Sequence, residues 1–480
     1  MPWLRIIYAI LGSILASLVL VFGMSIFHRI PTGEITSIGM LLSLLLSCVA
    51  LAYMTVRNSP RLIISPMPWF LLASGAYFGF GPLLYSFGNE LAIAFSQSIW
   101  FVGQQELLRV TIVNATGVLI VYSVWFYLVT KAPVSRASPP GTRQLRNAIF
   151  VFYAVGIPPR CLNIFAEIGL LSFTLPGFLF WVANLTGAGL VLLTIMTLRK
   201  GGGWWALWGV MLTMDLLGAL VVISKSAILL AVMPCVFGYL LNKPKKAALW
   251  WIPVFLLVVY FLANSFVTFA RERLLQNHST ASRVGMAQAY LESDEEKLLD
   301  DVGQLWWVRL NYANAQEFAM QEYQAGHPGN SLKLALIAPI PRILWPGKPI
   351  IESGREFYER LTGEKTATFG IGFFSEAYWN GGWIAVILCS AAIGWLFARI
   401  TMVLGAELAL GNVWALPFAL LWIRSGARVD GWVHTEIVGP AVFTLIAVVV
   451  MRYWLGNPRE RIAKNKSAQT ARKRVPVKSS

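Results

Sequence analysis

The chain has 480 residues, of which 57% are hydrophobic and only 13% are charged, and its mean hydropathy is +0.63. This composition excludes a soluble globular protein and is typical of a chain that crosses a membrane many times. The formal net charge is +16, but the excess of basic residues lies in short loops between apolar runs. That distribution follows the positive-inside rule, so we expect no nucleic-acid partner.

Apolar runs of about 17–25 residues recur along the chain, which is the length that a helix needs to span a bilayer. We count twelve predicted spans, at about 5–27, 35–56, 68–86, 107–130, 147–165, 175–198, 204–223, 227–241, 249–269, 381–397, 413–423 and 433–453. The first has no convincing cleavage site, so we expect a retained helix rather than a removed signal. The predicted fold class is an all-α integral membrane protein with about twelve transmembrane helices.

Basic loops predict that both termini are cytoplasmic. The loops that this orientation places inside all begin at basic residues, namely Arg57, Lys131, Arg199, Lys243 and Arg399. Residues 456–480 form a tail with eight Lys or Arg against one Glu. We therefore predict transmembrane helices 1–9 in residues 1–269, a periplasmic loop over 270–378, helices 10–12 in 379–455 and a basic cytoplasmic tail over 456–480.

Residues 270–378 form the one long polar interval, with 14 of the 23 acidic residues and 11 Lys or Arg. Its middle, residues 336–349, contains four prolines, which stiffen the backbone around Arg342, Trp345 and Lys348. A structureless connection of this length is improbable in a compact protein. We expect a partly helical loop that takes part in the function.

Cations on the predicted outer face are candidates for binding an anionic substrate, among them Arg160, Lys225, Arg309, Arg342, Lys348 and Arg428. Lys225 lies in a three-residue turn between two apolar spans, where a cation needs an anionic partner. A lipid pyrophosphate or a nearby carboxylate would serve. Arg342 and Lys348 flank Trp345 and either hold a diphosphate beside an aromatic face for a sugar, or form a rigid corner on the membrane surface.

A transfer reaction also needs a general base, and the sequence offers several. Glu376 lies five residues before the tenth predicted span among aromatic residues that are expected to exclude water, while Asp430, His434 and Glu436 lie near the twelfth. The alternatives are that Glu376 neutralises a loop arginine and that His434 is a packed polar residue. Asp215, inside the seventh span, is expected to pair with another helix or to line a cavity.

Several familiar sites are missing from the sequence. It has no P-loop, no dinucleotide-binding turn, no paired zinc histidines and no nucleophile elbow, so we expect no cofactor and no metal. The four cysteines, Cys48, Cys161, Cys235 and Cys389, fall in or beside apolar spans without metal-ligand spacing. We expect no disulfide framework.

The order of these features resembles the O-antigen polymerases and related repeat-unit polymerases of bacterial surface polysaccharides. The turn Ser224-Lys-Ser226 stands where members often show Ser-Arg-Gly, the loop reads Ile340-Pro-Arg-Ile-Leu-Trp-Pro-Gly-Lys-Pro349, and Glu376-Ala-Tyr-Trp-Asn-Gly381 precedes the next span. The resemblance covers about residues 204–400. Lys225 in place of an arginine is a departure, because lysine lacks the bidentate geometry.

The resemblance implies a metal-independent glycosyltransferase of the bacterial inner membrane that acts on the periplasmic face. Its donor and acceptor would be glycans linked to undecaprenyl diphosphate, and a chain-length regulator protein is an implied partner. Two alternatives stay open, an O-antigen ligase that transfers glycan to lipid A core and a lipid-linked oligosaccharide flippase or transporter. The proline-rich motif favours the polymerase over the ligase, and the nearly charge-free spans disfavour the transporter.

Overall fold

The computed structural model describes residues 10–16, 19, 32–130, 141–167, 179, 182–221, 223, 225–242, 254–255, 258–263, 266–267, 270, 305–340, 345, 347–349, 351–365 and 367–455. These residues form α-helices, short 3-10 and π-helical segments, turns and irregular backbone. The prediction of an all-α fold is confirmed for this part of the chain.

Six helices among the described residues are long and apolar enough to cross a membrane. They are Glu34–Arg57, Pro66–Phe87, Gln104–Thr130, Thr142–Ala166, Gly203–Val221 and Phe373–Ala409. They match the second, third, fourth, fifth, seventh and tenth predicted spans and indicate a membrane-embedded protein. The sixth, eighth, eleventh and twelfth predicted spans correspond to shorter helices, and most of the first and ninth lies outside the described residues.

The chain divides into two compact units. The first comprises Met1–Ala137, Trp307–Leu410 and Leu421–Ser480, and the second comprises Ser138–Trp306 and Gly411–Leu420.

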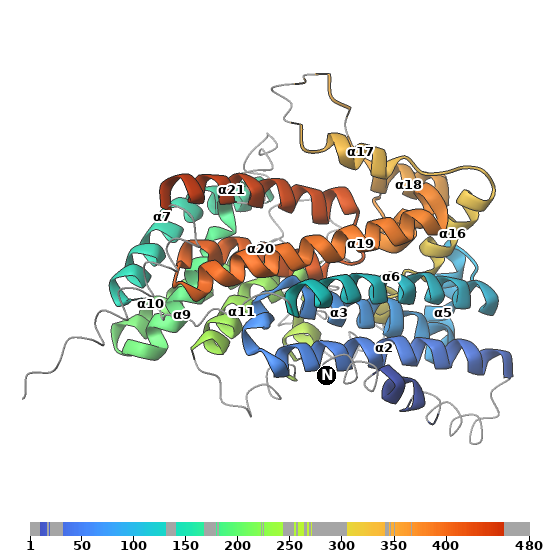
Figure 1. Ribbon diagram of the computed structural model, residues 1–480, viewed down its shortest axis with the longest axis horizontal. Coiled ribbons are helices and arrows are strands. Elements are labelled where there is room, and N and C mark those ends of the chain that lie inside the picture. The colour runs from blue at the N-terminus through green and yellow to red at the C-terminus, as the bar shows by residue number, and fades with distance from the viewer. Residues whose placement is uncertain are drawn as a thin grey trace, which may run out of the picture. The chain divides into compact units, whose positions relative to one another are not determined.

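In the first unit, α6 (Gln104–Thr130) and α19 (Phe373–Ala409) lie side by side (Figure 1). Gly394 of α19 leaves no room for a Cβ against the Val121 backbone, so a glycine is what lets the two helices approach closely. The buried indole N–H of Trp125 donates to Thr401 Oγ1 at 3.1 Å. This bond satisfies a polar group that lipid could not satisfy.

Aromatic side chains fill the interior between α19 and α3 (Pro66–Ser74). The Phe70 ring packs edge-to-face on Phe374 and on Phe397, with centroids 6.3 Å and 5.7 Å away, and Phe397 packs on Trp422 at 6.1 Å. Since lipid tails are as apolar as these rings, close packing rather than the hydrophobic effect stabilises such contacts within a membrane.

The described part of the polar interval contains four short helices, as expected. They are α15 (Leu305–Val308), α16 (Ala313–Gln324), α17 (Ser331–Ile337) and α18 (Ser353–Thr362). The predicted start of the tenth span at Gly381 agrees with the structure, because Gly381 and Gly382 have non-helical backbone angles that separate two helices within α19. The short helix before the kink, residues 373–380, lies at the end of the polar interval.

In the second unit, α9 (Leu185–Lys200) packs against α7 (Thr142–Glu167), α10 (Gly203–Val221) and α11 (Lys225–Leu241). Asp215 of α10 pairs with another helix, as one of its two predictions stated, through Arg160 Nη2 at 3.0 Å. Arg160 Nη1 also donates to Thr186 Oγ1 of α9 at 3.3 Å. Arg160 and Asp215 therefore neutralise each other within this unit.

Candidate active site

The candidate site lies in the first unit, where residues 369–373 run beside residues 428–433. The Gly372 N–H donates to the Asp430 carbonyl at 3.2 Å, the Phe373 N–H to the Val429 carbonyl at 3.3 Å. A Cβ at position 370 would collide with the Asp430 carbonyl, and Gly372 has a φ of 77°. Two glycines thus bring the start of α19 against the segment between α20 (Leu416–Ala427) and η5 (His434–Val438).

Arg428 lies between two buried carboxylates. Its Nε is 3.5 Å from Asp430 Oδ1, and its Nη2 is 3.9 Å from Glu436 Oε1. Burial lowers the pKa of Arg428, but Asp430 and Glu436 outweigh it and hold that pKa above the ordinary value. The arginine side chain is 39% exposed against 12% and 10% for the two carboxylates, so the cation is the group that a ligand reaches first.

Three aromatic rings adjoin this charged cluster. The Tyr312 hydroxyl donates to Asp430 Oδ2 at 3.2 Å, and its ring packs edge-to-face on Tyr77 at 5.6 Å and on Phe369 at 5.7 Å. Burial, reinforced by the charge of Asp430, raises the pKa of Tyr312 well above its ordinary value. Tyr312 therefore stays a hydrogen-bond donor over the whole physiological range.

Glu376 is fully buried in the first turn of α19. Its Oε2 accepts a hydrogen bond of 2.7 Å from the Val433 N–H, at the start of the C-terminal helical segment. The first N–H groups of a helix lack intrahelical partners and the helix dipole favours an anion there. This hydrogen bond is to backbone, and the alternative that Glu376 neutralises a loop arginine stays a prediction, because Arg342 and other arginines of the loop lie outside the described residues.

His434 follows directly in η5 and is half-buried. Its ring centroid lies 6.3 Å from that of Trp432, and its Nδ1 has no hydrogen-bond partner among the described residues. The imidazole is therefore beside the site, while no described contact joins it to Asp430 or to Glu376.

Helix α16, which follows Tyr312, is fixed by buried polar contacts to α6. The fully buried carboxylate of Glu317 accepts hydrogen bonds from Arg109 Nη2 and, at 3.3 Å, from Arg109 Nε. Gln316 accepts from Asn114 Nδ2 at 3.0 Å and donates to the Ile371 carbonyl at 3.3 Å. This chain of bonds joins α6, α16 and the segment 369–373, which positions Tyr312 over Asp430.

The pKa of Glu317 reflects two opposing effects. Burial raises the pKa of this carboxyl above its ordinary value, while hydrogen bonds from Arg109 and Gln321 lower it. A buried carboxylate with three charge-assisted or amide donors is a strong attachment point for a helix only while all its partners are in place.

No protein-family model, no curated protein and no solved structure matches this chain. Among the described residues no group of three or more His, Cys, Asp or Glu side chains is arranged to hold a metal ion.

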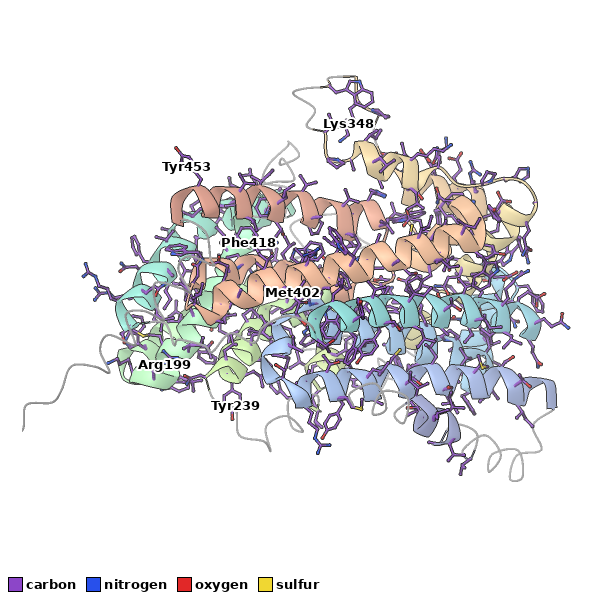
Figure 2. The ribbon with its side chains drawn as sticks, in the orientation of Figure 1. Arg199, Tyr239, Lys348, Met402, Phe418 and Tyr453 are labelled. Carbon is purple, nitrogen blue, oxygen red and sulfur yellow. The ribbon has the colours of Figure 1, made fainter. Side chains whose placement is uncertain are left out.

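The other predicted site residues are scattered. Lys348, labelled in Figure 2, donates through Nζ to the carbonyls of Ala338 and Ile340 at 2.7 Å and 2.9 Å, which closes the proline-rich segment on itself. Trp345 is 40% exposed and Arg309 is exposed. Arg342 lies outside the described residues, as does the side chain of Lys225, and Arg160 belongs to the second unit.

Sequence reasoning missed Tyr312, Tyr77 and Glu317. Tyr312 lies 118 residues from Asp430 along the chain, and Glu317 lies 208 residues from Arg109. Neither residue is conspicuous in the sequence, because Tyr312 is a tyrosine in a polar interval and Glu317 is one of many glutamates. The run Asn311-Tyr-Ala-Asn-Ala-Gln-Glu317 does carry an unusual density of amide side chains for an otherwise apolar protein, and that density was the available clue.

Proposed function

We propose that this protein is a membrane glycosyltransferase that joins undecaprenyl-diphosphate-linked oligosaccharide units into a surface polysaccharide on the periplasmic face. In this proposal the protein lies in a bacterial inner membrane and crosses it twelve times. Residues 270–378 are periplasmic, and both termini are cytoplasmic. The observation that carries it is the partly exposed side chain of Arg428 beside the buried carboxylates of Asp430 and Glu436. A cation next to shielded carboxylates suits a diphosphate leaving group and a hydroxyl nucleophile.

The reaction needs one bond to form and one to break. The oxygen of an acceptor sugar hydroxyl attacks the anomeric carbon of the donor, and the bond between that carbon and the diphosphate oxygen breaks. The electron pair leaves on the diphosphate, whose added charge Arg428 stabilises. The hydroxyl proton passes to a carboxylate.

Asp430 is our choice for that carboxylate, and Glu376 is the runner-up. Asp430 adjoins the half-buried side chain of Arg428 and the ring of Tyr312, whereas Glu376 has no exposed surface and holds the Val433 N–H. In this assignment Glu376 is a positioning residue that fixes the backbone next to His434. Aromatic rings such as Tyr312 and Phe369 would offer apolar faces to a sugar.

The test uses purified protein in vesicles with lipid-linked repeat units, and reads the product ladder. Asp430→Asn is expected to slow polymer formation by roughly 10²–10⁴-fold, as loss of a general base does. Glu376→Gln keeps an oxygen that accepts the Val433 N–H and is expected to retain activity within about tenfold of wild type. Glu356→Gln, at an exposed position of α18, is the matched control.

Each other outcome identifies a different answer. A large loss in Glu376→Gln with activity retained in Asp430→Asn makes Glu376 the base. Transfer of a finished glycan to lipid A core without ladder growth makes the protein a ligase. Movement of lipid-linked glycan across the vesicle membrane without any glycosidic product contradicts a glycosyltransferase.

A further inference from the structure

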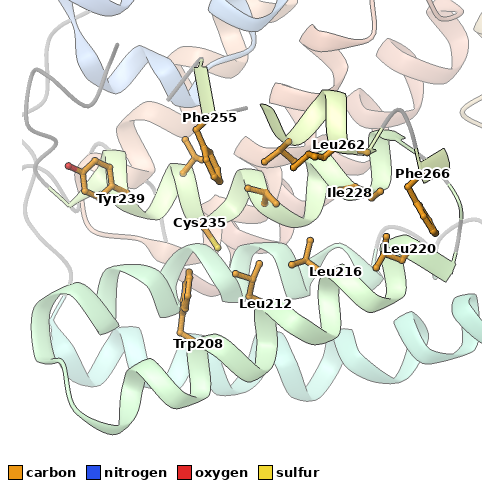
Figure 3. Close-up of a pocket in the computed structure, with 14 residues that line it drawn as sticks. Trp208, Leu212, Leu216, Leu220, Ile228, Cys235, Tyr239, Phe255, Leu262 and Phe266 are labelled. Carbon is orange, nitrogen blue, oxygen red and sulfur yellow. The ribbon is translucent and has the colours of Figure 1, made fainter. Parts of the chain in front are cut away.

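The second unit contains an apolar cavity of about 600 Å³ between α10, α11 and the described residues Phe255, Val259, Leu262, Ala263 and Phe266 (Figure 3). Trp208, Leu216 and Leu220 face it from α10, and Ile228 and Cys235 face it from α11. None of the described residues that line it carries a charge.

The wall of the cavity offers few hydrogen-bonding partners to a water molecule. The indole N–H of Trp208 donates to Thr194 Oγ1 of α9 at 2.9 Å, so its ring offers only carbon to the cavity. A buried water typically needs two to four polar partners. An apolar occupant therefore fits the lining better than water does.

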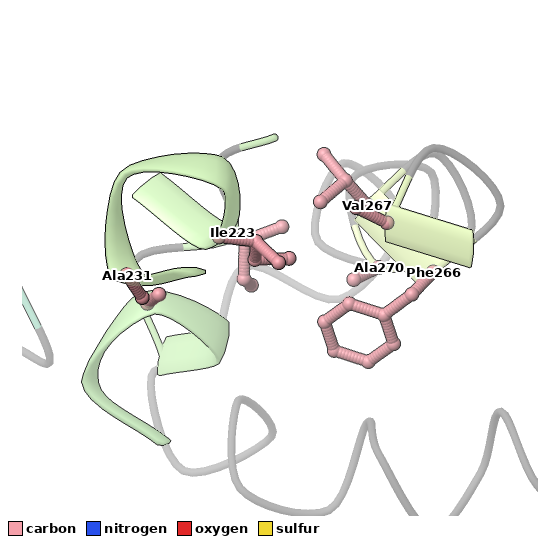
Figure 4. Packing of buried hydrophobic residues seen from close by; sticks show 8 residues of the cluster. Ile223, Ala231, Phe266, Val267 and Ala270 are labelled. Carbon is pink, nitrogen blue, oxygen red and sulfur yellow. The ribbon is translucent and has the colours of Figure 1, made fainter. Parts of the chain in front are cut away.

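Part of the cavity wall is buried and part is exposed. Ile228 and Phe266, which line the cavity, belong to a buried cluster. Ile223 and Val267 belong to the same cluster (Figure 4). The lining side chains Phe255 and Leu262 are 50% and 68% exposed. Because α10 is long and apolar enough to cross a membrane, we expect these exposed side chains to meet lipid.

The length of the cavity suits one acyl chain. From Trp208 to Leu220 the wall follows twelve residues of helix, about 18 Å at 1.5 Å per residue. This length is close to the roughly 15 Å of hydrocarbon in one leaflet, along which a phospholipid acyl chain lies.

We propose that this cavity binds one acyl chain of a bilayer phospholipid. The chain fills the space between α10 and α11 and restores the van der Waals contacts that an empty cavity would lose. The inference does not depend on the proposed glycosyltransferase activity, since it concerns the second unit alone and its test reads no turnover.

The first experiment uses phosphatidylglycerol with a diazirine halfway along one acyl chain, mixed at low mole fraction into vesicles that contain the protein. After irradiation, adducts are mapped by mass spectrometry and are expected on the cavity faces of α10 and α11. Leu216→Trp fills the cavity and is expected to reduce those adducts about fivefold or more, because a filled site excludes the chain. Leu217→Trp is the matched control, since Leu217 is 58% exposed and does not line the cavity.

The second experiment tests the proposal even if the Leu216→Trp protein does not accumulate. In delipidated wild-type protein, added phosphatidylglycerol is expected to slow modification of Cys235 by N-ethylmaleimide about fivefold or more, because an occupied site shields the thiol. Cys161, which lines a different, smaller cavity, is the internal control. Equal adducts in Leu216→Trp and Leu217→Trp overturn the proposal. So does a Cys235 rate that phosphatidylglycerol leaves unchanged or that only undecaprenyl phosphate slows.

Discussion

Tyr312 connects the aromatic rings of the candidate site to its charges, because one hydroxyl bonds to Asp430 while the ring packs on Phe369. The orientation of a carboxylate beside an arginine depends on the other hydrogen-bond donors that contact it. The tyrosine thus decides which oxygen of Asp430 remains available to a substrate, and its removal separates the positioning of Asp430 from its charge.

Tyr312→Phe is expected to lower the rate of polymer formation about tenfold. A hydrogen bond to a charged group contributes about 1.5–3 kcal/mol, and rearrangement around Asp430 is expected to recover part of that loss. The ring and its packing remain, so protein abundance should not change. The measurement is initial rate in vesicles at matched protein amount, with Tyr358→Phe on α18 as control. Equal rates for the two variants would show that Asp430 does not need the Tyr312 hydroxyl.

The raised pKa of Tyr312 also predicts how stability depends on pH. The unfolded chain loses the phenol proton at its ordinary value of about 10, whereas the folded chain keeps it to higher pH. Above about pH 10 the folded state therefore binds more protons than the unfolded state, and stability falls as pH rises. Tm measured from about pH 9 to 11 should fall less steeply in Tyr312→Phe than in wild type, and parallel curves contradict this.

At the scale of helices, the kink in α19 rests on one residue with a left-handed backbone. Gly382 has a φ of 60°, and a Cβ there would lie 2.9 Å from the Tyr323 ring and hydroxyl, whereas Gly381 has an extended φ of −170°. Since the left-handed region is strained for residues with a Cβ, the two neighbouring glycines differ in what they tolerate.

Gly382→Ala is expected to destabilise the protein by about 1–3 kcal/mol through backbone strain and displacement of Tyr323. Gly381→Ala is the matched control and is expected to cost less, because any residue adopts its φ. Thermal unfolding in detergent, followed by tryptophan fluorescence, measures both. A thermal unfolding midpoint for Gly382→Ala at or above that for Gly381→Ala would contradict a role for the Gly382 kink in the site.

The attachment of α16 to α6 gives a second helix-scale prediction. Arg109→Ala leaves the buried Glu317 carboxylate without its charged partner and is expected to cost about 2 kcal/mol or more. The double variant Arg109→Leu with Glu317→Leu removes both charges and is expected to recover most of that loss. The measurement is the protease sensitivity of residues 305–340. A double variant as sensitive as Arg109→Ala would contradict the explanation that the unpaired Glu317 charge causes the loss.

At the scale of the whole molecule, orientation decides on which side of the membrane the chemistry occurs. We expect a cysteine at Ser293 to react with an impermeant thiol reagent in intact spheroplasts, and one at Ser467 to react only after lysis. The four native cysteines are replaced first. Labelling at Ser467 but not at Ser293 reverses the orientation and with it the proposed periplasmic reaction.

Hydropathy predicted the helices well wherever a span is long and isolated, as for α2 (Thr32–Asn58) and α6. It placed the start of the tenth span at Gly381, where the kink separates the two helices of α19, but it did not predict the short helix of residues 373–380, which has no long apolar run of its own. For the site, sequence position alone nominated Glu376, Asp430 and Arg428. The partners that orient Asp430 and fix α16, Tyr312 and Arg109, are set by tertiary pairing over more than a hundred residues, which a single sequence does not encode locally.

The pairing of residues 369–373 with 428–433 has a consequence for how the protein is made. A ribosome delivers Tyr312, Arg109 and Glu376 to the membrane long before Asp430, and the Val433 N–H that holds Glu376 comes later still. Until the last helices are inserted, the earlier part of the chain holds a buried glutamate without its hydrogen-bond donor and a tyrosine without its carboxylate. Assembly of the site therefore waits for residues 428–433, and a chain that ends before them leaves Glu376 and Tyr312 without these partners.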